Sequence, residues 1–531
     1  MSIDDRFPYP SQRMPVMARN VVATSQPLAA QAGLRMLQLG GNAVDAAIAA
    51  AAVLTVVEPT GNGLGSDAFA LVWDGQRLHG LNASGRSPAA LTPERFSGLD
   101  AVPYGGWDSV TVPGAVSGWV ALHERFGSLP LTTLLSDAIR YAEEGFAVTP
   151  IIARGWALSQ RRFGTRADWS AAFAPAGRTP AAGETWRFGA QARSLSAIAE
   201  TRGEAFYRGA LADAMVAHAR SEDGLLTHED LASHRADWVE PIGTGYRGVE
   251  LHEIPPNGQG LAALLALGIL RHRPDLHDHP LDSPAWLHLQ IEAMKLALAD
   301  AYRWVADVEH MREVTVDDLL DDDYLAGRAR LIDATRAADP GHGTPTRGGT
   351  VYLTSADASG RMVSYIQSNY AGFGSGVVVP DTGISLQNRG AGFVLTPGHP
   401  NRVAGGKRPF HTIIPAFLTE GGAARCSFGV MGGPMQAQGH LQMTLRLVDH
   451  GQNPQAASDA PRWRVGEGRT LSLEAGTPPA TVQALADLGH AVSLTPPEQS
   501  FGFGGAQLVW RDGEHYVAAS DHRKDGQAVG Y

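Results

Sequence analysis

The chain has 531 residues, and its 43 lysines and arginines against 54 aspartates and glutamates give a formal net charge of −11. This balance argues against a nucleic-acid partner, because phosphate binding needs concentrated positive charge. No stretch reaches the roughly 18 uncharged apolar residues of a membrane span, and the first twenty residues lack an apolar, signal-like core. We therefore expect a cytoplasmic enzyme of small molecules with no membrane partner.

Length and cysteine content set further limits. At about 150 residues per domain, the length predicts three or four domains or one large layered α/β unit. Cys426 is the single cysteine, which excludes an intrachain disulfide framework and a zinc site made of cysteines alone. We expect Cys426 to be a buried small hydrophobic residue.

The first part of the chain predicts two helices, a glycine loop and a hairpin. They are expected at residues 26–40, 43–57, 61–67, 68–73 and 77–81. The second helix is apolar nearly all round apart from Asp45, so it must be buried between layers. The glycine loop precedes a strand, whereas a dinucleotide-binding loop follows a strand and opens a helix, so we do not expect it to bind phosphate.

The middle of the chain, residues 116–300, has mostly helical apolar repeats, interrupted by a Pro-rich segment at residues 252–260. His272, His277 and His279 gather in a loop rich in proline and aspartate. A metal-dependent amidase that uses these histidines is one alternative. No ligand spacing on a regular element supports it, so we expect a solvated loop and neither a metal nor another cofactor.

Strand character begins at Thr350. The pattern then predicts strands at residues 350–356, 362–370 and 425–430, a helix at 435–449 and a hairpin around Asp512-Gly513. Helices before, strands centrally and helices after indicate a pair of sheets covered on both faces.

The sequence lacks the motifs of the common serine, zinc and cysteine hydrolases. Ser375 lacks the flanking glycines of a serine-hydrolase elbow, and His228-Glu229 is not followed by a histidine at zincin spacing. A cysteine protease would need Cys426 exposed and paired with a histidine. Threonine is the nucleophile type that remains.

Thr350 follows Gly348-Gly349, where a Pro/Gly-rich run that starts at Asp339 gives way to a strand. If the chain cuts itself between Gly349 and Thr350, the new α-amine, with a reference pKa of about 7.7 to 8.0, can take the proton of the threonine hydroxyl. The β-methyl group restricts the side chain, so the hydroxyl is aimed in advance. The alternative is an ordinary threonine that begins a strand after a turn.

Several short motifs follow one another in a fixed order. They are Gly40-Gly41-Asn42-Ala43-Val44-Asp45-Ala46, Glu58-Pro59 with the glycine loop, Pro113-Gly114-Ala115-Val116, Phe373-Gly374-Ser375-Gly376, Lys407-Arg408-Pro409, Gly432-Gly433, Ser520-Asp521-His522-Arg523 and Gly530-Tyr531. With these motifs the chain resembles the γ-glutamyltransferases, which are N-terminal-nucleophile hydrolases, over nearly its whole length. The resemblance implies an α+β fold in a four-layer αββα sandwich. It also implies self-cleavage into a large subunit, residues 1–349, and a small subunit, residues 350–531, that stay associated.

The same resemblance implies roles for single residues. Thr350 matches the nucleophile, and Ser368 matches a hydroxyl that supports the threonine amine. Gly432 and Gly433 match the pair whose backbone N–H groups form the oxyanion hole, where glycine permits close approach. Arg86 matches the arginine that holds the substrate carboxylate through its planar fork.

The chain departs from the family pattern around the substrate. The acidic residue that binds the substrate α-amine aligns with Gly392, in the segment that begins at Asn388, and the paired serines after Lys-Arg-Pro become His411 and Thr412. A buried ammonium group without its carboxylate partner costs several kcal/mol. These departures argue against a γ-glutamyl substrate and make Asn388, His411 and Thr412 candidate substrate-binding residues.

Arg389 stands where the family has a neutral amide. With Arg86 it suggests an anionic substrate that lacks an α-amine, such as a dicarboxylic monoamide or a glutaryl-type amide. We therefore expect an amide hydrolase that transfers the acyl group of a small carboxylate-bearing amide to water through Thr350. Glutathione and other γ-glutamyl compounds, oxamate and glutaryl cephalosporins remain open as substrates, as do transfer to an amine and an uncleaved, non-catalytic homologue.

Overall fold

The computed structural model describes residues 12–340 and 349–531. Two predictions fall partly outside these ranges. They are the N-terminal stretch before residue 12 and the expected cleavage loop from Asp339 to Gly349, of which residues 341–348 lie outside. Among the described residues, no helix is both long enough and apolar enough to span a bilayer.

A seven-stranded antiparallel sheet, here called the β10 sheet, contains the strand that carries Thr350. Its strands in spatial order are β21 (Gln527–Gly530), β2 (Val21–Thr24), β10 (Gly349–Ala356), β11 (Met362–Tyr370), β3 (Asp67–Trp73), β4 (Leu78–Ala83) and β7 (Asp237–Val239). The predicted strands at residues 68–73, 350–356 and 362–370 are confirmed in this sheet, and β3 and β4 form the expected hairpin.

A second seven-stranded antiparallel sheet, the β15 sheet, faces the first. Its strands in spatial order are β1 (Val16–Ala18), β20 (His515–Ser520), β19 (Gly505–Asp512), β15 (Ala423–Met431), β14 (Ala416–Glu420), β9 (Val249–Glu253) and β8 (Ile242–Tyr246). The predicted strand at 425–430 and the hairpin at Asp512-Gly513 are confirmed here.

Apolar side chains fill the space between the two sheets. Phe69 and Tyr352 of the β10 sheet pack with Phe417 and Val509 of the β15 sheet. A Cβ atom added at Gly429 of β15 would lie only 2.4 Å from the Tyr352 ring, so the glycine lets β15 approach β10 closely. The sheets therefore share one compact core that also fixes the position of β10.

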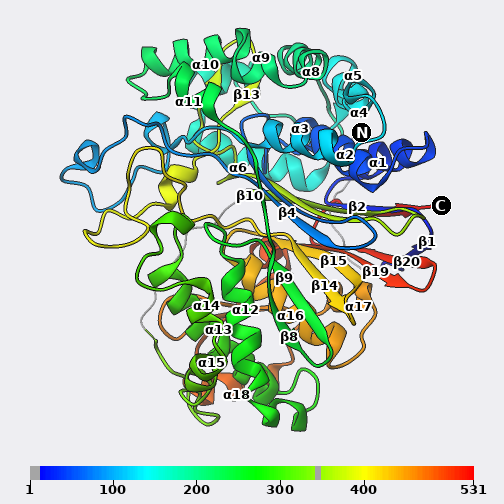
Figure 1. Ribbon diagram of the computed structural model, residues 1–531, viewed down its shortest axis with the longest axis vertical. Helices are drawn as coiled ribbons and strands as arrows, with labels where there is room; N and C mark the ends of the chain where they lie inside the picture. Colours follow the sequence, from blue (N-terminus) through cyan, green and yellow to red (C-terminus); the bar gives the residue numbers. More distant parts are fainter. Residues whose placement is uncertain (1–11, 341–348) are drawn as a thin grey trace.

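Helices cover the outer face of each sheet (Figure 1). Helix α2 (Ala43–Val57) is buried at all 15 of its positions and lies against β10 and β11, which agrees with its nearly uniform apolar sequence. It packs with α1 (Pro27–Gln38) on the β10 sheet. The β15 sheet packs against α12 (Gly260–Arg271), α13 (Pro284–Trp304) and α16 (Met435–Val448).

Other elements surround these layers. They include α3 (Ala115–Phe126), α5 (Ser136–Glu144), α6 (Pro150–Phe163), α8 (Gly189–Thr201), α9 (Glu204–Tyr207), α10 (Ala210–Ser221), the short helix η5 (Arg389–Gly392), α18 (Pro479–Asp487), and a small sheet of β16 (Trp463–Val465), β17 (Thr470–Glu474) and β18 (Ala491–Thr495). The region 116–300 is mostly helical as predicted, but β7, β8 and β9 were missed. In β8, glycines at 243 and 245 weaken the strand pattern, and pairing with β9 decides the conformation.

Candidate active site

Thr350 lies at the start of β10, opposite an irregularity in the strand pairing. Gly349 pairs with Tyr370 and Val351 pairs with Gln367, so two residues of β11 lie opposite Thr350 alone. Such a bulge re-aims the side chain beside it. The Thr350 hydroxyl donates to the Ser368 hydroxyl oxygen at 3.2 Å, and both side chains are buried.

Ser368 is held from two directions. Its hydroxyl oxygen also accepts the backbone N–H of Tyr370 at 2.8 Å, and Ser368 lies in register with Asp67 of the neighbouring strand β3. The structure thus brings Ser368 next to Thr350, as the family pattern implied. Its supporting role in the reaction stays a prediction.

The glycine loop after α2 lies against Thr350. A Cβ atom at Gly61 would come within 3.3 Å of the Thr350 carbonyl carbon and oxygen, and the Gly61 carbonyl accepts the N–H of Asn369 at 3.1 Å. Sequence analysis identified this loop as a motif without a chemical role. Its close approach to β10 explains why a residue without a side chain stands there.

Gly432 and Gly433 form the turn between β15 and α16, with φ angles of 129° and 61° that favour glycine. The Gly433 carbonyl accepts the side-chain N–H of Gln259 at 2.9 Å, which fixes the turn.

This turn lies at the end of β15 that approaches Thr350. Thr354 of β10 contacts Ser427 of β15 at 2.5 Å between hydroxyl oxygens, and two residues toward Thr350 the Tyr352 ring meets Gly429. As the residue number falls along β10, the number of the residue that it contacts rises along β15. Thr350 therefore lies toward Met431 and the glycine turn that follows it.

Arg389 is a buried guanidinium that is only partly hydrogen-bonded. Its Nη1 donates to the Thr412 hydroxyl at 2.9 Å, and its guanidinium lies over the Tyr370 ring at 4.8 Å. Its Nε and Nη2 have no hydrogen-bond partner among the described residues, although the residue is 1% exposed. Burial lowers the pKa of Arg389 to about 10, opposed by Asp67, so the group stays charged at neutral pH. Two free N–H donors on one planar cation match a carboxylate.

His411 forms a fully buried pair with Asp67 of β3. His411 Nε2 lies 3.1 Å from Asp67 Oδ2, and Asp67 Oδ1 accepts the backbone N–H groups of Gly85 and Gly114. Burial raises the pKa of Asp67 to about 7, while Arg389 opposes the shift. Burial and the nearby Arg389 hold the pKa of His411 well below its usual range. Sequence reasoning singled out His411 but missed Asp67.

Arg86 and Asn388 make other contacts. Arg86 is partly exposed, pairs with Asp307 at 2.9 Å and donates to the Gly406 carbonyl at 3.2 Å, so its part in holding substrate stays a prediction. The Asn388 amide donates to the Tyr104 carbonyl at 2.8 Å and accepts the N–H of Ala371 at 3.0 Å. Asn388 therefore fixes the backbone that leads into η5 beside Arg389.

Gly392 has no room for a side chain. A Cβ atom there would lie 2.6 Å from the Phe410 carbonyl oxygen. A carboxylate at this position is therefore incompatible with the backbone as it stands. Position 392 therefore departs from the family pattern in the space available for a side chain as well as in residue type.

The histidines of the 272–279 loop do not come together. His272 contacts Asp322 at 3.0 Å, and His277 accepts from Arg247 at 2.9 Å. Within residues 12–340 and 349–531, the groups with metal-ligand spacing are His288, Glu292 and His490, and Asp168, His218 and Glu222. In the first group the Lys295 ammonium donates to Glu292 at 2.8 Å, so a protein cation already occupies that cluster.

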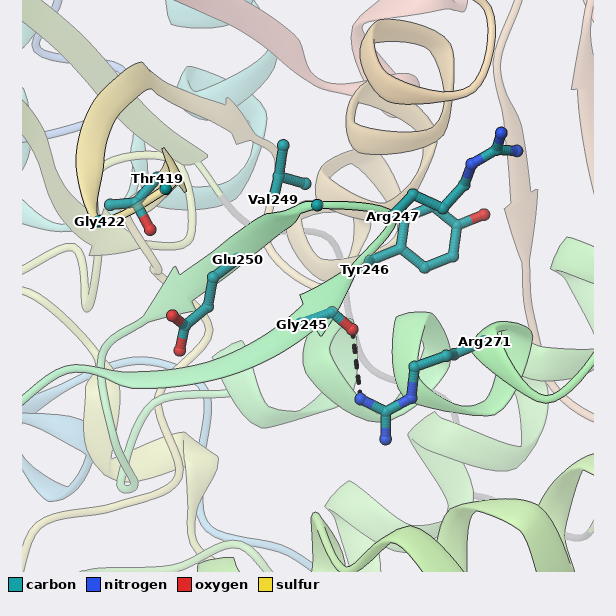
Figure 2. Close-up of a pocket in the computed structure, with 10 residues that line it drawn as sticks. Gly245, Tyr246, Arg247, Val249, Glu250, Arg271, Thr419 and Gly422 are labelled. Atoms are coloured by element: carbon teal, nitrogen blue, oxygen red, sulfur yellow. Dashed lines mark hydrogen bonds between the residues drawn. The ribbon is translucent and has the colours of Figure 1, made fainter.

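A separate open pocket of 480 Å³ lies at the turns of the β8–β9 and β14–β15 hairpins. Figure 2 shows Arg271 donating to the Gly245 carbonyl on one side and Thr419 and Gly422 on the other. None of its lining residues contacts Thr350 or Arg389 in the hydrogen bonds described above. We assign it no part in the chemistry.

The chain is similar to several known proteins in sequence and in fold. The chain is 36% identical to a glutathione hydrolase-like YwrD proenzyme of Bacillus subtilis over 97% of this chain and 100% of that protein. It is 36% identical to an oxamate amidohydrolase proenzyme of Klebsiella pneumoniae over 95% and 97% of the two chains. A crystal structure of cephalosporin acylase from Bacillus halodurans has 48% identity and a TM-score of 0.94, and covers 100% of this chain and 99% of that one.

The fold and these relatives define a class: an amide hydrolase or acylase with the architecture of the N-terminal-nucleophile type. The model of the family described as gamma-glutamyltranspeptidase matches residues 29–531. The chain belongs to the γ-glutamyltranspeptidase family and is an enzyme of that family.

Proposed function

We propose that this enzyme is a self-processing amide hydrolase in which Thr350 becomes an N-terminal nucleophile. The support is local: a buried hydroxyl at a strand start, hydrogen-bonded to Ser368, with a glycine turn at the facing end of β15. Cleavage between Gly349 and Thr350 gives a large subunit, residues 1–349, and a small subunit, residues 350–531. The helix, sheet, sheet, helix stack is then the four-layer αββα sandwich of this class.

The reaction follows from the groups at the strand start. The freed α-amine of Thr350 accepts the hydroxyl proton while Oγ1 attacks the substrate amide carbonyl. The backbone N–H groups of Gly432 and Gly433 donate to the developing oxyanion. The amine proton passes to the leaving nitrogen, and water then attacks the acyl-enzyme and releases the acid. A second amine in place of water gives transfer.

The observation that carries the substrate class is the buried Arg389. A guanidinium with two free donors in a buried site favours a carboxylate, because charge-assisted, bidentate hydrogen bonds are the strong ones. Thr412 orients the group through its hydroxyl. We assign Arg389 to the carboxylate of the acyl group and Arg86 to the exposed edge of the site, while Asn388 fixes the backbone that precedes Arg389.

The shape at Gly392 favours acyl groups that lack an α-amine. A γ-glutamyl ammonium would have no carboxylate at this position, and an unpaired buried charge costs several kcal/mol. We therefore expect oxamate-type and glutaryl amides to be better substrates than glutathione. This order agrees with the names of the oxamate amidohydrolase and cephalosporin acylase relatives.

A denaturing gel of the purified protein, followed by assays of amine release, tests the proposal. The wild type is expected as two bands that correspond to residues 1–349 and 350–531. Thr350→Ala is expected to stay in one piece with activity lowered by about 10³-fold or more. Thr350→Ser keeps a hydroxyl and an amine and is expected to process and to hydrolyse slowly. Full activity of an uncut chain, or of Thr350→Ala, would overturn the proposal.

A further inference from the structure

The buried charges near Arg389 nearly cancel before substrate arrives. Arg389 carries one positive charge, and Asp67 is the carboxylate that acts on it most strongly, although no ion pair within 4.0 Å joins the two among the described residues. His411 connects the two: its ring contacts Asp67, and the next residue, Thr412, accepts from Arg389. The three groups form one electrostatic unit.

The hydrogen bonds define where the protons lie. The backbone N–H of Ile413 points at His411 Nδ1 at 3.4 Å, so the ring proton sits on Nε2, which faces Asp67 Oδ2. The pair then carries one proton and a net charge of −1. One more proton, on Asp67 or on the imidazole, makes the pair neutral.

Other charged and titratable groups face Asp67 from neighbouring elements. Arg408 acts on Asp67 from the 407–409 segment, but Asp237 compensates it at 2.7 Å. Burial and, to a smaller degree, the charge of Asp67 raise the pKa of Tyr207 of α9. The Tyr207 hydroxyl donates to the Pro113 carbonyl and accepts from the Ser117 N–H. Neither group supplies a free positive charge. Arg389 is therefore the cation that balances Asp67.

A bound carboxylate changes this balance. With Arg389, Asp67 and the ligand carboxylate all charged, the buried unit would carry a net negative charge, and an uncompensated buried charge is strongly unfavourable. A proton from solvent removes the excess. On the proposed function, in which Arg389 reads a substrate carboxylate, we propose that the Asp67–His411 pair takes up one proton when the anionic acyl group binds.

Because binding takes up a proton, the affinity for the anionic acyl group falls as the pH rises. Deprotonation of the free pair opposes binding, so the dissociation constant rises with pH above neutrality, by up to about tenfold per pH unit. The empty pair accepts its proton near neutral pH, because burial raises the pKa of Asp67 to about 7. The pair thus sets substrate affinity without touching the reacting atoms and acts as a positioning element.

Calorimetric titration of the processed enzyme with glutarate tests the inference. Titration at pH 8 in two buffers of different ionisation enthalpy measures proton uptake directly. We expect uptake in the wild type and its loss in Asp67→Asn, with glutarate still bound and a flat affinity between pH 7 and 9. The control is Glu253→Gln, which alters an equally buried carboxylate–histidine pair, Glu253 and His440 at 2.6 Å, and should leave uptake unchanged.

The outcomes distinguish failure of the proton-coupled pair from failure of the proposed substrate class. Glutarate binding without proton uptake, or uptake that persists in Asp67→Asn, overturns the proton-coupled pair and leaves the substrate class standing. Absence of glutarate binding to a processed, active enzyme overturns both. A wild-type dissociation constant that stays flat between pH 7 and 9 overturns the proton-coupled pair even if Asp67→Asn fails to fold.

Discussion

At the scale of single residues, the site is distinguished by the buried cation Arg389. Arg389 has one hydrogen-bonded nitrogen, an aromatic ring beneath it and two free donors. The enzyme holds this group at the cost of desolvation, which is visible in its lowered pKa. On the proposed function, a substrate carboxylate recovers that cost on binding, and a neutral acyl group does not.

Arg389→Gln should therefore discriminate between substrates. For an N-glutaryl anilide we expect kcat/KM to fall by about 10- to 100-fold, the value of one or two charge-assisted hydrogen bonds, whereas an N-butyryl anilide should change by less than about threefold. Initial rates on both substrates measure this. Arg178→Gln, at an exposed arginine that pairs with Glu184, serves as the control. Equal losses on both anilides would contradict the assignment.

At the scale of elements, the close approach of β10 and β15 positions Thr350. Gly429→Ala places a methyl group 2.4 Å from the Tyr352 ring, so we expect a loss of about 1–3 kcal/mol in the free energy of unfolding. Chemical denaturation measures this. Gly245→Ala, in β8 of the same sheet with no atom within 4 Å of the added Cβ, should change stability by less than about 1 kcal/mol. Similar losses in both variants would refute the argument.

A buried ionic network connects the small β16–β18 sheet to the end of β20. Asp521 pairs with Arg462 at 2.6 Å and Arg523 at 3.1 Å, and Arg523 also pairs with Glu474 at 2.6 Å. These arginines hold the pKa of Asp521 well below its usual range. A depressed carboxylate pKa contributes stability above the unfolded value of about 3.9, and this contribution is lost as the pH falls.

We expect Asp521→Asn to cost about 3–5 kcal/mol at pH 7, because it leaves two buried guanidinium groups without their shared anion. The penalty should shrink as the pH falls from 5 to 2. Urea unfolding at several pH values measures both effects. A penalty that is the same at pH 7 and pH 2 would exclude an ionic origin.

The elements differ in how far the sequence predicts them. Long or strongly patterned segments such as α2, α16, β11 and the hairpin at Asp512-Gly513 were predicted nearly residue by residue. The glycine-rich β8 was missed, because pairing with β9 rather than its own residues makes it a strand. In the site, the local sequence singled out Thr350, and the family resemblance singled out Ser368. Asp67 did not, because its contact with His411 spans 344 positions.

At the scale of the whole molecule, the proposed subunits share both sheets. In the β10 sheet, β10 and β11 of residues 350–531 lie between β2 and β3 of residues 1–349, and β21 pairs with β2. In the β15 sheet, β14 pairs with β9 and β20 pairs with β1. Separation would break hydrogen bonds in both sheets and open the core between them.

We therefore expect the two pieces to remain one particle after cleavage. Size-exclusion chromatography with light scattering should give a mass that contains both pieces at neutral pH, and separation only in denaturant. Uncleaved Thr350→Ala should elute at the same volume as the processed wild type. Release of either piece from the native enzyme would contradict the interleaved arrangement.

The crowding around Gly392 also bears on how this enzyme can diversify. Because the Phe410 carbonyl occupies the space of a side chain at position 392, a single substitution of Gly392 by an acidic residue cannot create a binding site for the α-amine of a γ-glutamyl group. The loop that carries Phe410 must first move away from residue 392. Laboratory selection for glutathione turnover should therefore yield mutations around residue 410 before any at 392, so that backbone movement sets the order of adaptive steps.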